Sequence, residues 1–128
     1  MFLGMRAGRR LADQRAKDVA SLDGSASATV TAQKLIDEYR TNELEADSRY
    51  KGHPIEVSGN IWKISVGPVG GAFVSLKGER QPEIRFVQCM LANPADGLGL
   101  RPEQRITIRG IGRGMMGGIS LRPCKVVR

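Results

Sequence analysis

Hydrophobic and polar residues alternate through residues 54–66, and this alternation is the clearest pattern in the chain. Ile55, Val57, Gly59 and Ile61 fall on one side at a period of two, and polar residues fall on the other. The pattern predicts a long β-strand that is buried on one side. A glycine in its middle lets such a strand bend, so that one strand can serve two halves of a barrel.

Four shorter segments with a β-type pattern follow this strand. They cover residues 72–77, 84–91, 105–111 and 119–127, and segments rich in glycine and proline separate them. Pro123 interrupts the last segment, and a proline at such a place requires a bulge or a sheet edge. The chain is therefore predicted to be mainly β from residue 54 onward.

A helix is predicted before the long strand, because apolar residues recur there at helical spacing. Thr31 is a candidate N-cap with Thr29 as the alternative, and Gly52 with Pro54 ends the helix. The apolar stripe consists of Ala32, Leu35, Ile36, Tyr39, Ala46 and Tyr50. We expect this stripe to pack against the strands, since an isolated helix of this length is marginal in water.

Residues 1–30 show no comparable stripe, since only Leu11, Val19 and Leu22 could share one side of a weak helix, and they are predicted to be a flexible basic tail that is at most transiently helical. The functional alternative for this tail is a basic arm that contacts phosphate. The domain is then expected to span residues 31–128. A helix followed by five strands, with the first long and bent, is the element order of an OB-type barrel with an N-terminal α-helix.

Several short runs in the chain also agree with one known family. They are Asn42–Gly52 with its Asn-Glu-x-x-Ala-Asp-x-x-Tyr-Lys-Gly pattern, Ile55–Gly59, Val87–Cys89, Ile106–Gly110 and Leu121–Cys124. Together these runs resemble the bacterial tRNA-anti-like OB-fold family over about residues 30–128. The resemblance implies the barrel, whereas the family has no settled activity. Many of its members look like envelope proteins or lipoproteins.

The start of the sequence favours a cytoplasmic protein. Met1–Gly4 is the only apolar cluster there, shorter than the roughly 7–15 apolar residues of a secretory signal, and no lipobox cysteine is near. No run approaches the ~18 apolar residues of a membrane span. A periplasmic or envelope location would require a misassigned or processed start.

Positive charge is concentrated in the predicted barrel. The chain has a formal net charge of +7, and residues 52–128 hold eleven basic and five acidic side chains. This excess favours an anionic partner, with single-stranded nucleic acid as one candidate.

The OB-type barrel suggests where such a partner would bind. Ligands of this fold usually lie across its second and third strands and the loops that join strands one to two and four to five. Here these are residues 67–71, 72–77, 84–91 and 112–118. The candidate contacts are Phe73, Lys77, Arg85 and Arg113, with Phe86 and Trp62 nearby.

Aromatic residues make up only 5% of the chain, and this scarcity supports an alternative function. The protein would then be an envelope-type OB domain that binds a protein or a small ligand, or that acts as a scaffold.

Cys89 and Cys124 are predicted to be neighbours, because strands three and five close a barrel of this kind. In an oxidising compartment the pair could form a disulfide, and in the cytoplasm both would stay buried thiols.

The sequence does not favour an enzyme. With His53, the two cysteines are the only soft metal ligands, too few for a four-ligand structural zinc site, so we expect no metal. Gly112–Gly117 matches Gly-x-Gly-x-x-Gly, but β-type sequence follows it, which indicates a hairpin turn and no nucleotide cofactor. Neither a serine elbow nor a pair of acids is apparent.

Overall fold

Strand β2 (Pro54–Val66) takes part in both halves of a closed barrel. In the computed structural model, which describes residues 13–80 and 85–128, residues 54–60 pair with β5 (Arg105–Met115) and residues 60–66 pair with β3 (Ala72–Lys77). Both pairings are antiparallel.

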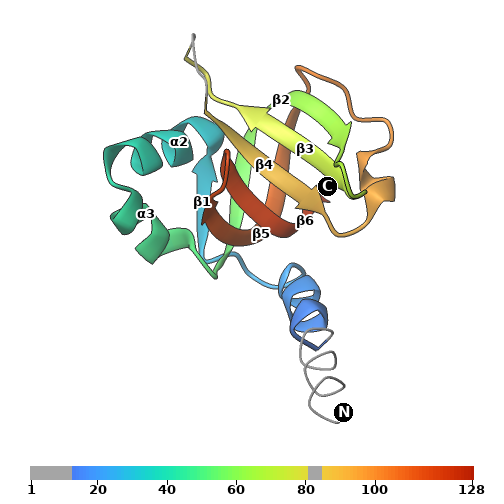
Figure 1. Cartoon of the computed structure of the whole chain (residues 1–128), viewed down its shortest axis with the longest axis horizontal. Helices are drawn as coiled ribbons and strands as arrows, with labels where there is room; N and C mark the ends of the chain where they lie inside the picture. The colour runs from blue at the N-terminus through green and yellow to red at the C-terminus, as the bar shows by residue number, and fades with distance from the viewer. Residues whose placement is uncertain (1–12, 81–84) are drawn as a thin grey trace.

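Strands β4 (Phe86–Leu91) and β6 (Ile119–Val127) complete the barrel. Strand β4 lies antiparallel to β3 and parallel to β6, and β6 pairs with β5. The predicted mainly β fold with a five-stranded barrel is confirmed within the described residues (Figure 1).

The strand boundaries agree closely with the alternation in the sequence. β2, β3 and β6 begin and end at the predicted residues. The start predicted for the third strand, at residue 84, lies outside the described residues. Strand β5 continues to Met115, past the predicted end at residue 111, because the ladder with β6 carries two register shifts around Gly112 and Gly114. The turn between β5 and β6 is correspondingly short.

Gly59 and Trp62 play different parts in the shape of β2. The register of the β2–β3 ladder shifts between Ile61 and Lys63, so the irregularity lies at Trp62. A Cβ at Gly59 would stand 2.9 Å from the Cβ of Ala32. Gly59, which was predicted to let the strand bend, therefore leaves room for the start of the helical segment.

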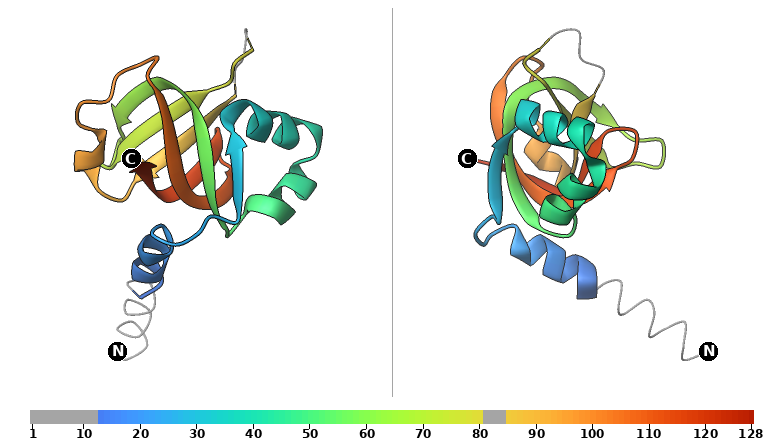
Figure 2. Two further views of the ribbon diagram at one scale, coloured as in Figure 1. Left: turned by 180° about the vertical axis from the view of Figure 1, so that it is seen from behind. Right: turned by 90° about the vertical axis from the view of Figure 1, so that its left-hand side faces the viewer.

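The predicted helix is two helices, α2 (Ala32–Thr41) and α3 (Glu43–Tyr50), and the prediction of one continuous helix is wrong. Asn42 ends α2 and begins α3, because its extended backbone breaks the helix while its side chain accepts a hydrogen bond from the Glu45 backbone N–H at 3.1 Å. The right-hand view of Figure 2 shows both helices in front of one end of the barrel.

The apolar stripe of α2 and α3 is buried, as predicted. Leu35 and Ile36 are fully buried, and Tyr39 and Tyr50 are each 4% exposed. The Tyr39 hydroxyl donates to Asp47 Oδ1 at 2.9 Å, and the Tyr50 hydroxyl donates to Glu38 Oε2. These hydrogen bonds satisfy the polar ends of rings whose bodies lie in the core.

Residues 13–30 are not a flexible tail, and that part of the prediction is wrong. Residues 13–21 are helical, and Leu22 is 1% exposed. Strand β1 (Ala28–Thr31) then pairs in parallel with residues 55–58 of β2. The remainder of the predicted tail, residues 1–12, lies outside the described residues.

Candidate functional site

The outward positions of β2, β3 and β4 build one face of the barrel. Val74 and Leu76 of β3 point into the core, so Phe73, Ser75 and Lys77 point outward. The register places Phe73 opposite Met90 and Lys77 opposite Phe86 on β4.

We call the outward residues Trp62, Lys63, Phe73, Lys77 and Phe86 the aromatic face. Trp62 and Lys63 both belong to it, because the register shift at this point of β2 returns Ile64 to the inside, opposite Val74. Of the six aromatic residues in the chain, three lie on this face.

Two of the aromatic rings meet across β3. The centroids of Trp62 and Phe86 are 5.2 Å apart with the ring planes tilted by 45°. Ser75 lies at an outward position of the intervening strand and is only 4% exposed, so neighbouring side chains cover it. Trp62 itself remains 49% exposed and presents a large part of its ring to solvent.

Glycines of two loops fix the positions of the phenylalanine rings. A Cβ at Gly67, in the β2–β3 loop, would lie 2.6 Å from the ring of Phe73. A Cβ at Gly118, between β5 and β6, would lie 2.7 Å from the ring of Phe86. Each ring therefore rests against a loop that borders the aromatic face, and a side chain at either glycine would displace it.

The lysines of this face differ in their partners. Lys63 is exposed, whereas Lys77 Nζ lies 2.5 Å from Glu103 Oε1. An anion that binds Lys77 must therefore compete with a carboxylate that is itself 66% exposed.

The two arginines of the predicted site do not lie in the middle of the face. Arg85 precedes β4, and its Nη1 is buried. Arg113 is on β5, where its Nε donates to the Arg122 carbonyl at 2.8 Å and its Nη2 pairs with Asp18 at 2.9 Å. Arg113 lines a cavity together with Met90, the residue opposite Phe73, so it borders the far end of the face.

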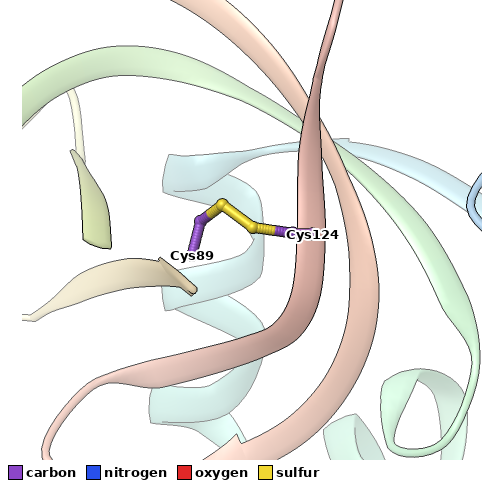
Figure 3. Close-up of a disulfide and its surroundings, with 2 residues drawn as sticks. All are labelled: Cys89 and Cys124. Atoms are coloured by element: carbon purple, nitrogen blue, oxygen red, sulfur yellow. A yellow bond between two sulfur atoms is a disulfide. The ribbon is translucent and has the colours of Figure 1, made fainter. Parts of the chain in front are cut away.

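The predicted proximity of Cys89 and Cys124 is confirmed. The two residues form a disulfide between β4 and β6 with Cα atoms 5.9 Å apart, and both side chains are fully buried (Figure 3). The ladder between these strands shifts register between Cys89 and Leu91, and Leu91 is opposite Cys124. The shift accompanies Pro123, as the sequence predicted.

The structure thus brings Phe73 and Lys77 together with Phe86 and Trp62, and it adds Lys63. Strict alternation would place Lys63 on the inward face of β2, and only the register shift at Trp62 moves it to the outward face. A lysine at an inward position of an otherwise regular pattern is the signal that could have located this shift.

No group of three or more metal-binding side chains occurs in the part of the chain that the structure describes. In the same residues no helix is long and apolar enough to cross a membrane.

Known proteins share this architecture. No curated protein matches the chain. The crystal structure of a "putative nucleic acid-binding lipoprotein" from Klebsiella pneumoniae subsp. pneumoniae MGH 78578 is similar, with a TM-score of 0.62 and 22% sequence identity. The match covers 77% of this chain and 91% of the Klebsiella chain, and at this identity it shows a shared fold.

The family model tRNA_anti-like matches residues 3–125. This range includes α2, α3 and the barrel strands as far as residue 125 in β6, so the match extends beyond the short runs noted in the sequence. The chain belongs to the tRNA_anti-like family.

Proposed function

We propose that this protein is a non-enzymatic OB-type binding module whose aromatic face binds single-stranded nucleic acid weakly and with little sequence preference. The observation that carries the proposal is the exposed ring of Trp62, which packs against Phe86. Single-strand binding proteins of this fold stack bases on such rings, and each stacked base contributes about 1–3 kcal/mol.

The charges around the face support the same function. Lys63 and Lys77 lie on the face beside the rings, and Arg113 borders its far end. A backbone that crosses the face from the rings toward Arg113 would meet positive side chains along its path. The Klebsiella protein with the same fold is named a "putative nucleic acid-binding lipoprotein", and this name agrees with the proposal.

Trp62 provides a direct test because it is the only tryptophan in the chain. We expect a single-stranded oligothymidylate, titrated at low salt, to quench the intrinsic fluorescence in a saturable manner, because a stacked base contacts the indole. Anisotropy of a labelled oligonucleotide gives the affinity. The absence of binding at micromolar protein would refute the proposal.

A pair of variants distinguishes base stacking on Trp62 from non-specific hydrophobic binding. Trp62→Ala should weaken binding by about tenfold, in line with the loss of one stacked base. Leu44→Ala is the matched control, since Leu44 is 83% exposed on α3, away from the face. Equal affinities for the two variants would show that the aromatic face is not the site.

Salt dependence tests the lysines. The logarithm of the affinity should fall with the logarithm of salt concentration with a slope of about −0.7 per phosphate neutralised. Changing Lys63 and Lys77 together to alanine should flatten this slope by about 1.4 if each lysine contacts one phosphate. The control changes Lys34 and Arg101, which are exposed elsewhere, and should leave the slope unchanged.

Glu103 supplies a change in the opposite direction. Because its carboxylate holds Lys77, Glu103→Gln should free the ammonium group and strengthen binding. Glu45→Gln removes the same charge from α3 and should have a smaller effect. An equal gain from both variants would indicate an effect of net charge alone.

A second candidate function is favoured by the disulfide. Disulfides persist in oxidising compartments, so an envelope-type module that binds a protein or a small ligand would suit a protein that works there. Trapping free thiols in intact cells and counting them by mass spectrometry distinguishes the two settings. Oxidised Cys89 and Cys124 support the envelope, and two free thiols support the cytoplasm.

A further inference from the structure

A cavity of about 310 Å³ lies between the helix at residues 13–21 and the β4–β6 side of the barrel. Its apolar wall includes Met90, Leu91 and Pro123. Its charged rim consists of Arg15 from the helix and Arg113 and Arg122 from the barrel. The volume is at the lower end of the range for small-molecule sites, which is roughly 300–1,000 Å³.

The charge of this rim is only partly compensated. Asp18 is the one carboxylate among the lining residues, and it is engaged by Arg113 and by the side-chain amide of Gln14 at 2.9 Å each. Arg15 and Arg122 have no carboxylate partner among the described residues. Two guanidinium groups therefore remain available beside an apolar wall.

This combination selects for a particular ligand chemistry. Guanidinium groups are weakly hydrated and bind planar or tetrahedral oxyanions through paired hydrogen bonds. An apolar wall next to them favours a ligand whose charge is attached to an apolar body. We propose that the cavity is a binding site for small organic anions, such as carboxylates, sulfonates or phosphate esters, that carry an apolar group. The anion pairs with Arg15 and Arg122, and the apolar group lies against Met90, Leu91 and Pro123.

The experiment uses two probes that differ only in charge. Anilinonaphthalene sulfonate has an anionic sulfonate on an apolar ring system, and phenylnaphthylamine has the same rings without the sulfonate. Both become fluorescent in apolar surroundings, so each can be titrated directly with the full-length protein. We expect saturable binding of the sulfonate with one site per chain. The neutral probe should bind about tenfold more weakly or worse, because it lacks the hydrogen bonds to charged donors.

The variant Arg15→Gln with Arg122→Gln tests the rim without breaking the Asp18–Arg113 ion pair. It should weaken binding of the sulfonate probe by about tenfold and leave binding of the neutral probe unchanged. Unchanged binding of the neutral probe also shows that the cavity is intact. Arg101→Gln with Arg105→Gln is the matched control, since it removes the same charge from residues outside the lining. The proposal is overturned if both double variants bind the sulfonate equally well, or if the two probes bind the unaltered protein with equal affinity.

Filling the cavity tests its location. Ala92 is a lining residue, and Ala92→Phe should block both probes while the thermal unfolding transition stays cooperative. Unchanged sulfonate binding in a folded Ala92→Phe protein would place the probe elsewhere and reject the site. All titrations contain no nucleic acid, so their failure would leave the proposed function of the aromatic face untouched.

Discussion

Two helical regions cover the barrel, and different kinds of contact attach them. Helices α2 and α3 are attached by an apolar stripe, in which Leu35 and Ile36 are fully buried. The helix at residues 13–21 is mostly exposed and is attached mainly by charge, through the Asp18–Arg113 pair and through Asp23 with Lys125 at 2.6 Å. Leu22 is the one fully buried apolar side chain at its end, and its carbonyl accepts a hydrogen bond from Arg109 at 2.7 Å.

The difference shows how attachment determines what a helix can do. A buried stripe stabilises α2 and α3 by the hydrophobic effect, which salt hardly weakens. Ion pairs that remain partly exposed, such as these two, contribute little and are screened by salt. We therefore expect α2 and α3 to remain docked whenever the barrel is folded. The helix at residues 13–21 should undock more readily.

The largest effect on stability should come from Tyr39→Ala in the apolar stripe of α2 and α3. Removal of a large buried ring leaves a cavity, and the free energy of unfolding should fall by about 3–5 kcal/mol. Urea denaturation followed by circular dichroism measures the change. An unchanged midpoint would mean that α2 and α3 are an appendage like the other helix.

Reduction of the disulfide should have the next largest effect. The bridge joins residues 35 positions apart, and a loop of this size corresponds to about 3–4 kcal/mol in the chain-entropy model. The urea midpoints with and without a reducing agent measure this contribution. Reduction requires no substitution, so every other side chain is unchanged. Because β4 and β6 are part of the barrel, both helical regions should lose protection together. Loss of protection in only one helical region would contradict the expectation that the bridge stabilises the barrel under both.

A smaller loss of stability should appear at high pH. Burial and the hydrogen bond to Glu38 raise the pKa of Tyr50 to about 12, and burial with the hydrogen bond to Asp47 also raises the pKa of Tyr39. A raised folded pKa gives stability that is complete below the ordinary tyrosine pKa near 10 and is lost as pH rises toward 12. The slope of stability against pH over this interval should be reduced in Tyr39→Phe with Tyr50→Phe. The same slope in the double variant would exclude these tyrosines as its source.

The smallest effect should come from the charged attachment. Asp18→Asn should cost at most about 1 kcal/mol, since only one partly exposed pair is lost. Asp23 contributes less, although the hydrogen bond from Lys125 lowers its pKa. Hydrogen exchange should become faster at residues 14–22 in the Asp18→Asn and Asp23→Asn double variant and stay unchanged in α2. Asp13→Asn is the control, because Asp13 forms no hydrogen bond or ion pair with the barrel among the described residues, and it should change neither region.

The same contrast explains how much of the fold could be predicted. Alternation determined the bounds of β2, β3 and β6, and the apolar stripe identified the residues of α2 and α3 that are buried. The helix at residues 13–21 was missed because two ion pairs and one leucine leave no periodic pattern. The break at Asn42 could have been found, since asparagine three residues before a glutamate is a typical helix N-terminus.

The candidate site was less predictable because it depends on register. Phe73 and Lys77 follow from simple alternation along β3. Trp62 and Lys63 share the face only because of a local register shift, and the contacts of Lys77 and Arg113 with Glu103 and Asp18 join residues distant in sequence. Single-sequence patterns carry no information about such pairings.

Strand β1 has a consequence for how this protein avoids aggregation. Residues 55–58 of β2 are hydrogen bonded to β5 on one side and to β1 on the other. Without β1, that second side would present unpaired backbone groups, which are a template for strand addition between molecules. β1 replaces this exposed edge with one of only four residues, and short edge strands resist such pairing. We therefore expect a fragment that begins at residue 32 to retain the barrel strands and to self-associate more readily than the full chain, because residues 55–58 would then be open to pairing with a second molecule.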